Sequence, residues 1–332
     1  MNETVLKRVA IVGAGAIGGW LGARLAQAGG EVSVLARGDT LRVLQTDGLQ
    51  LHQAGERLVV PVRATAEASQ LGVQDLVVVA VKAPALADVA RQIGPLIGPT
   101  TIILTAMNGV PWWFLDGVGG EFAGSRLKSV DPDGTVAEAI PSQQVMGCVV
   151  HASCSVDAPG VVRHHFGNGL IIGEPAGGIG ERARAVASRL QSAGFEATVS
   201  PQIQKDIWYK LWGNMTVNPI SALTGATTDR ILGDPLVVGF VSSVMLEAKA
   251  IGERIGIPID QQPEDRHAVT RKLGAFKTSM LQDVAAGKPV ELDALVTSVR
   301  ELGQLTGVAT PFTDALLGLS RLQAQTLGLY PE

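Results

Sequence analysis

The sequence predicts an α/β domain at the N-terminus and an all-α domain after it, covering residues 1–200 and 201–332. Three observations support this prediction. Apolar runs alternate with helix-like stretches over the first 110 residues or so, as in a chain of βαβ units. Short apolar runs follow at 145–175, separated by turn signals at 158–160 and 167–169, and helical periodicity dominates from residue 203 onward.

Each element rests on its own local pattern. The run at 76–81 is continuously apolar, which is typical of a strand buried on both faces of a parallel sheet. Further strands of a doubly wound sheet are predicted at 9–12, 31–36 and 101–105, and antiparallel extensions at 146–150, 160–164 and 169–172. A short strand is expected at 196–199. Helices are predicted at 19–26, 83–97, 181–192, 203–224, 236–255, 265–286, 290–305 and 311–327.

A glycine motif joins the first strand to the first helix. It has the pattern G-x-G-x-x-G and consists of Gly13, Ala14, Gly15, Ala16, Ile17 and Gly18. Glycine permits the tight turn, lets the backbone approach a pyrophosphate, and lets helix and strand pack closely. The free amides at the helix start favour bound phosphates. This context predicts a Rossmann-type dinucleotide site, with a methyltransferase-type adenosyl site as the alternative.

The end of the second strand bears on the choice of dinucleotide. An NAD site usually carries an acidic residue there, which binds the ribose 2′-hydroxyl. Here Arg37 follows the strand, and no acid appears before Asp39. A guanidinium suits a 2′-phosphate, so NADP is predicted over NAD; a solvated arginine is the alternative interpretation.

Composition excludes several classes of protein. A net charge of −4 provides no excess of positive charge that would attract nucleic acid or an anionic membrane. No continuous apolar run approaches the 18 or so residues of a membrane span, and the N-terminus lacks an apolar signal core, so a cytoplasmic protein is expected. Cys148 and Cys154 are interpreted as reduced, buried thiols. No metal site is expected, because the histidines show no ligand spacing; they are His52, His151, His164, His165 and His267.

One predicted helix carries an unusual polar stripe. Lys210, Asn214 and Asn218 are spaced i, i+4, i+8, so they lie on one face of helix 203–224 among apolar neighbours. Buried polar groups are costly unless they are paired. The stripe is therefore either a row of one cation and two amides facing a small oxygen-rich substrate, or a solvated face.

Taken together, these blocks resemble the ketopantoate reductase (2-dehydropantoate 2-reductase) family over nearly the whole chain. The matching segments are residues 13–18, Arg37, 81–83, 107–110, 210–214 with 218–219, and 279–283 followed by Glu291. The resemblance implies a Rossmann domain, a helical domain like that of 6-phosphogluconate dehydrogenases, and an active site in the cleft between them. It further implies NADPH-dependent reduction of a 2-keto acid to a D-2-hydroxy acid, above all 2-dehydropantoate to (R)-pantoate in pantothenate biosynthesis.

The resemblance also assigns roles in the helical domain. Lys210 matches the catalytic lysine, which would stabilise the developing alkoxide and donate a proton. Asn214 and Asn218 match residues that hold the substrate's oxygens, and Ser279 resembles a serine that contacts the carboxylate. Glu291 would be a catalytic-site partner that also lies near the cofactor; a plain glutamate in the first turn of a helix is the alternative.

Two residues at strand ends complete the expected site. Asn108 follows strand 101–105 at the edge where ligands bind in open α/β sheets, and the resemblance places it against both cofactor and substrate. Lys82 follows strand 76–81 in the same way and resembles a lysine that contacts the cofactor. An ordinary Asn-Gly turn is the alternative interpretation of Asn108.

The segment after Asn108 departs from the family pattern. Trp112 and Trp113 introduce large rings that either pack under the loop or reshape the substrate pocket. The substrate is therefore expected to be ketopantoate or another branched or aromatic 2-keto acid. A non-catalytic NADP-binding sensor is the alternative from a different functional class. A homodimer is considered as an assembly, and neither nucleic acid nor membrane is expected as a partner.

Overall fold

The structure of the protein is a computed structural model, and it describes residues 6–332. The chain divides into two compact units. The first unit contains the residues up to Met107 together with Gly134–Ile203, and the second contains Asn108–Asp133 and Gln204–Glu332. Segment 108–133 thus belongs to the helical unit. The sequence-based division into 1–200 and 201–332 instead assigns this segment to the first domain.

The first unit is built on one ten-stranded mixed sheet in the order β4-β3-β9-β8-β7-β6-β1-β2-β5, with β10 paired to β9. Strands β5, β2, β1, β6, β7 and β8 run parallel to one another, which confirms the Rossmann-type α/β class. The strands are β1 (Arg8–Val12), β2 (Glu31–Leu35), β3 (Leu49–Gln53), β4 (Glu56–Val60), β5 (Arg63–Thr65), β6 (Leu76–Val79), β7 (Ile102–Thr105), β8 (Val145–Ala158), β9 (Val161–Gly173) and β10 (Glu196–Val199).

The region 145–175 differs from the expectation of three short strands. It forms one long antiparallel hairpin of β8 and β9, and the turn signal at 167–169 lies inside β9. Gly167 has a φ of +80°, and the register shifts between His151 and Ser153 opposite it. The glycine therefore makes a bulge rather than a turn, because the partner strand continues past it. The hairpin of β3 and β4 was not predicted either.

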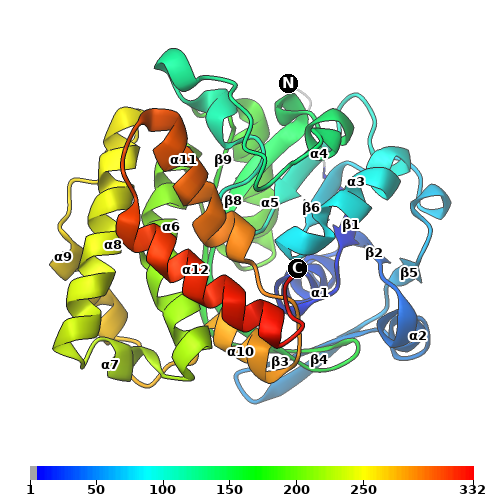
Figure 1. Cartoon of the computed structure of the whole chain (residues 1–332). Coiled ribbons are helices and arrows are strands. Elements are labelled where there is room, and N and C mark those ends of the chain that lie inside the picture. The colour runs from blue at the N-terminus through cyan, green and yellow to red at the C-terminus, as the bar shows by residue number, and fades with distance from the viewer. Residues whose placement is uncertain (1–5) are drawn as a thin grey trace. The chain divides into compact units, whose positions relative to one another are not determined.

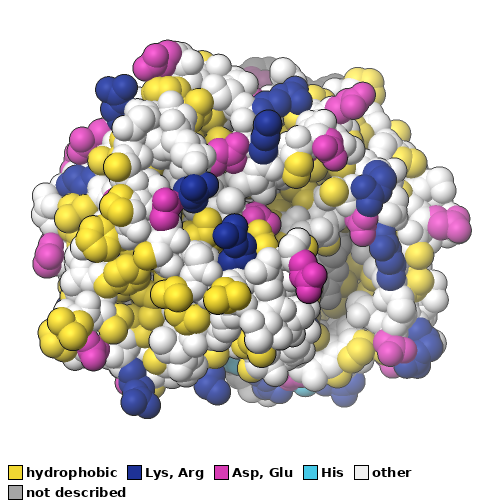
Figure 2. Space-filling model, viewed as in Figure 1, with side chains coloured by type: hydrophobic (Ala, Val, Ile, Leu, Met, Phe, Trp, Pro, Cys, Tyr) yellow, Lys and Arg dark blue, Asp and Glu magenta, His cyan; other side chains and the backbone are white. Residues whose placement is uncertain are grey.

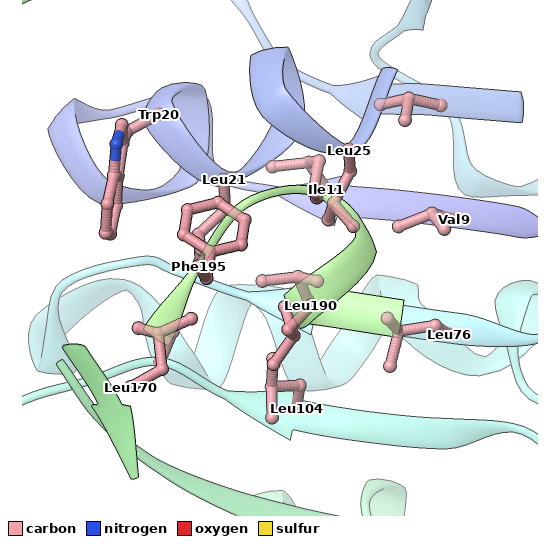
Figure 3. Packing of buried hydrophobic residues seen from close by; sticks show 14 of the residues in the cluster. Val9, Ile11, Trp20, Leu21, Leu25, Leu76, Leu104, Leu170, Leu190 and Phe195 are labelled. Atoms are coloured by element: carbon pink, nitrogen blue, oxygen red, sulfur yellow. The ribbon is translucent and has the colours of Figure 1, made fainter. Parts of the chain in front are cut away.

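One face of this sheet is covered by α1 (Ala16–Gln27) and α5 (Glu181–Ser192). Leu21 and Leu25 of α1 and Leu190 of α5 point toward the buried strand residues Ile11 and Leu104 (Figure 3). Because alternate strand residues face this layer, the continuous apolar runs of the parallel strands serve both faces. The remaining helices of this unit are α2 (Gly38–Asp47), α3 (Leu86–Ile93) and α4 (Thr135–Ala139).

The second unit is helical, as predicted. Its helices are α6 (Ile203–Thr224), α7 (Thr228–Ile231), α8 (Pro235–Arg254), α9 (Pro263–Arg271), α10 (Ser279–Ala285), α11 (Ser298–Thr306) and α12 (Pro311–Thr326). Helices α8, α11 and α12 pack against one another (Figure 1). The expected helix 265–286 is instead two helices, because Gly274, with a φ of +61°, ends the first. The expected helix 290–305 begins with a π-turn, Asp293–Thr297.

Helix α8 is long and apolar enough, by length and composition, to cross a membrane. One such helix is weak evidence of a span, since core helices pass the same test. Val244 and Ala248 of α8 are fully buried, and the helix contacts α9, α11 and α12. We therefore describe α8 as a packed helix of the second unit.

Candidate active site

The glycine turn of the first unit is tightly packed at two of its glycines and leaves open space at the third, Gly15. Gly13 has a φ of +96°, and a Cβ on Gly18 would lie 2.0 Å from the carbonyl oxygen of Gly13. A Cβ on Gly15 would meet nothing within 4 Å. Close packing thus requires glycine at Gly13 and Gly18, whereas Gly15 faces empty space beside the start of α1. The first amides of a helix have no partner within it, so this space suits an anionic ligand.

Two basic residues lie at the carboxyl edge of the same sheet. β1 pairs with β2 up to Leu35 and with β6 up to Val79, so the glycine turn lies between the segments that follow these strands. Arg37 is exposed at the N-cap of α2. Lys82 is half-buried after β6. The acid nearest to Arg37 on its C-terminal side, Asp39, is exposed and pairs with Arg42 at 3.4 Å.

The polar stripe of the second unit lies on α6. Lys210 and Asn214 are half-buried, and Asn218 is buried. The apolar side chains around them anchor the helix: the indole of Trp212 donates to the carbonyl oxygen of Met245 on α8 at 2.7 Å. The stripe is therefore not a fully solvated face.

Asn108 meets this stripe directly. Lys210 Nζ donates to Asn108 Oδ1 at 2.8 Å, although 102 residues separate them in sequence. The next residue, Gly109, has a φ of +84°, and a Cβ there would lie 2.5 Å from the carbonyl oxygen of Ala294. The Asn-Gly pair is thus a tight corner that places the amide of Asn108 against the ammonium of Lys210.

The same corner touches the segment that carries Glu291. The amide of Val110 donates to the carbonyl oxygen of Ala294 at 2.8 Å, within the π-turn. Glu291 is 9% exposed and lies just before this turn. On the other side of Glu291, the amide of Val290 donates to the carbonyl oxygen of Leu329 at 3.1 Å. The backbone around Glu291 is therefore held on both sides.

Ser279 lies at the first position of α10 and is exposed. The preceding residue, Thr278, caps the helix: its hydroxyl accepts a hydrogen bond from the amide of Leu281 at 3.2 Å. The cap fixes where the helix begins, so it also fixes the direction in which the hydroxyl-bearing Ser279 leaves the backbone.

The aromatic residues that follow Asn108 lie in the core of the second unit. Trp112 is 6% exposed, Trp113 1% and Phe114 0%. The ring of Phe114 lies 5.9 Å from that of Trp208 on α6. Of the two sequence interpretations, packing beneath the loop therefore has the direct support of burial.

Neither cysteine is placed for nucleophilic chemistry. Cys148 is buried, and burial raises the pKa of the Cys154 thiol to about 12. A thiol with that pKa stays protonated at neutral pH and is a poor nucleophile. Among residues 6–332, no group of three or more His, Cys, Asp or Glu side chains could hold a metal ion.

Comparison with known proteins gives one consistent result. The family described as ketopantoate reductase PanE/ApbA matches residues 9–177, and its C-terminal family matches residues 202–324. The 2-dehydropantoate 2-reductase of Mesorhizobium japonicum is 46% identical over 324 residues, covering 97% of this chain and 99% of that protein.

Solved structures agree with the sequence matches. A protein from Ralstonia solanacearum, described as a candidate ketopantoate reductase, superimposes with a TM-score of 0.95 at 60% identity, covering 98% of this chain and 100% of that one. The 2-dehydropantoate 2-reductase of Methylococcus capsulatus gives a TM-score of 0.82 at 27% identity, with 96% and 97% covered.

Proposed function

Because this chain belongs to the ketopantoate reductase family, we propose that it reduces 2-dehydropantoate to (R)-pantoate with NADPH. The observation that carries the proposal is the hydrogen bond from Lys210 to Asn108, at one end of a stripe of amides on α6. An ammonium has three donor hydrogens, so the bond to Asn108 does not by itself exhaust the donor capacity of Lys210.

The reaction requires that negative charge be stabilised on the keto oxygen of the substrate. Hydride addition to the keto carbon turns its oxygen into an alkoxide, which Lys210 would stabilise and then protonate. Asn214, Asn218 and Ser279 offer amide and hydroxyl donors for the carboxylate and remaining oxygens. Glu291 is 9% exposed, on the segment that touches the corner at Asn108 and Gly109. It would be the second catalytic group and would also contact the cofactor.

The residues of the first unit fit a dinucleotide. The open side of Gly15 leaves room for a pyrophosphate against the first amides of α1, and bound NADPH would supply the hydride. Gly13, Gly18 and the residues between them, Ala14, Ala16 and Ile17, shape this turn. Arg37 and Lys82 would hold the 2′-phosphate and further oxygens of the cofactor. We therefore propose that NADPH is preferred over NADH.

A panel of 2-keto acids assayed by loss of NADPH absorbance tests the proposal. We expect ketopantoate to be reduced with the highest kcat/KM, and NADH to support slower turnover. Reduction of a bulkier aromatic acid in preference to ketopantoate would correct the substrate. Tight NADPH binding without turnover of any 2-keto acid would favour the non-catalytic sensor and contradict the proposal.

We further propose that the protein acts as a soluble homodimer in the cytoplasm. Large apolar side chains are exposed along α12 and the neighbouring α8: Leu319 at 58%, Leu322 at 63%, Phe312 at 44%, Leu236 at 85% and Leu246 at 50%. Figure 2 shows hydrophobic side chains gathered over these helices. Phe312 and Leu319 are seven residues apart, the spacing of a helix–helix seam. Light scattering should give a dimer mass that Leu319→Glu reduces to a monomer; a wild-type monomer would contradict the assembly.

A further inference from the structure

Both ends of segment 108–133 are bonded to one helical segment, residues 292–306. Near the first end, the amide of Val110 donates to the carbonyl oxygen of Ala294. Near the other end, Lys128 N donates to Glu301 Oε1 at 2.7 Å and Ser129 N donates to Glu301 Oε2 at 2.9 Å. Residues 292–306 therefore hold segment 108–133 near both of its ends, and we call these two contacts the clamp.

The clamp at the first end leaves little freedom. Gly109 packs so closely on Ala294 that a side chain has no space. The carbonyl oxygen of Ala294 also accepts from the hydroxyl of Ser298 at 2.9 Å, and Ser298 is fully buried. Ala294 belongs to the π-turn, a rare geometry that is concentrated at functional sites. The carbonyl that receives Val110 is thus itself held in place.

At the second end, the contact consists of two charge-assisted hydrogen bonds to the Glu301 carboxylate. A carboxylate that accepts two adjacent backbone amides makes stronger bonds than neutral acceptors do. It removes conformational freedom from a segment that contains two short 3-10 helices, Phe114–Gly117 and Gly120–Phe122, but no α-helix or strand. Ordering a segment in advance lowers the entropy that must be lost at the moment of reaction.

From these contacts we infer that Glu301 is a positioning residue for the reductase reaction. It does not touch the reacting groups; it holds segment 108–133 on residues 292–306, so that Asn108 stays aligned as the acceptor for Lys210. The inference rests on the proposed function, because it gives Glu301 a kinetic role only if Asn108 and Lys210 act in turnover.

The chain contains a matched control for Glu301. Glu247 of α8 makes the same kind of contact, accepting from Phe312 N at 2.8 Å and Thr313 N at 2.9 Å, and it also accepts from the Thr313 hydroxyl at 2.6 Å. Its carboxylate caps the start of α12 instead of segment 108–133. Glu247→Gln therefore reproduces the chemical change of Glu301→Gln without touching the Asn108 segment.

A double-mutant cycle with Asn108→Ala tests the inference. Glutamine keeps the shape of Glu301 but has only one acceptor oxygen, so one amide loses its partner. We expect Glu301→Gln to lower kcat about tenfold, since small misplacements of catalytic groups are kinetically costly. In the Asn108→Ala background the same substitution should change kcat less than about twofold, because the group that it positions is gone. Glu247→Gln should lower Tm by a similar amount and leave kcat within about twofold in both backgrounds.

Each other outcome has a definite meaning. An equal fold loss in both backgrounds, or an unchanged kcat in Glu301→Gln, would show that Glu301 is only structural and would overturn the inference. Wild-type turnover in Asn108→Ala would instead contradict the role of Asn108 in the proposed function, and the inference would fall with it. If Glu301→Gln does not fold, Glu301→Asp keeps the charge but shortens the reach; its partial loss of kcat must likewise vanish with Asn108→Ala.

Discussion

The glycine turn of the first unit and the Asn108 corner of the second unit solve the same packing problem in different ways. Gly13 and Gly109 both have positive φ and lie against backbone that leaves no space for a side chain. The glycine turn is closed partly by its own motif, since Gly18 lies on Gly13, and partly by Ala80 and Val81, which follow β6. The Asn108 corner is closed by Lys210 and Ala294, which are far away in sequence. A local motif can be recognised from spacing, whereas a corner closed by distant residues cannot.

We expect the largest effect on stability from one of two substitutions within the glycine turn. Gly18→Ala places a methyl group in backbone and should cost at least about 4 kcal/mol of unfolding free energy. Gly15→Ala meets open space and should cost about 1 kcal/mol, the effect of alanine at an N-cap. Its main effect should be weaker NADPH binding. Denaturant unfolding and a fluorescence titration separate the two effects; equal stability of both variants would contradict the assigned packing.

The second substitution addresses the segment behind the Asn108 corner. Trp113 is 1% exposed, so Trp113→Ala should lower the free energy of unfolding by about 3–5 kcal/mol. The indole Nε1 has no hydrogen-bond partner among the described residues, so Trp113→Phe should lose much less. Neither variant should alter the ranking of 2-keto acids by kcat/KM. A tenfold change in that ranking, with stability preserved, would show that the ring lines the substrate pocket.

The smallest effect concerns cofactor choice at the edge of the first sheet. Arg37 stands where an NAD-binding acid is usual, and a charge-assisted contact is worth about 1.5–3 kcal/mol. Arg37→Ala should therefore weaken NADPH by tenfold or more and leave NADH nearly unchanged, measured as separate dissociation constants. Equal losses for the two cofactors would mean that Arg37 does not contact the 2′-phosphate.

Sequence reasoning succeeded where one element determines its own structure. The helix predicted at 203–224 has those bounds in the structure, and so does the helix at 181–192, because both patterns are long and periodic. The fold class and the family were also confirmed. The stripe of Lys210, Asn214 and Asn218 could be seen because helical spacing alone puts these residues on one face.

The features that could not be predicted from the sequence depend on contacts between residues that are distant in sequence. Glu301 lies 173 residues from Lys128, and no local pattern marks it as the acceptor for two loop amides. The sequence predicts an ordinary helix where the structure has the π-turn, because no local pattern distinguishes the two. The sequence predicts a turn at Gly167, because it does not show that the partner strand runs past this residue. The roles of the site residues, Ser279 and Glu291 among them, remain predictions.

The catalytic role of Lys210 is tested by Lys210→Ala, with kcat for ketopantoate and the dissociation constant for NADPH measured on the same preparation. We expect kcat to fall by roughly 10²–10⁴, the usual range for a general acid, because the alkoxide loses its proton donor. NADPH affinity should be nearly unchanged, since the proposed contacts of Lys210 are with Asn108 and the substrate. The unfolding midpoint should be nearly unchanged too, because the side chain is only half-buried. A variant that turns over at close to the wild-type rate would contradict the account.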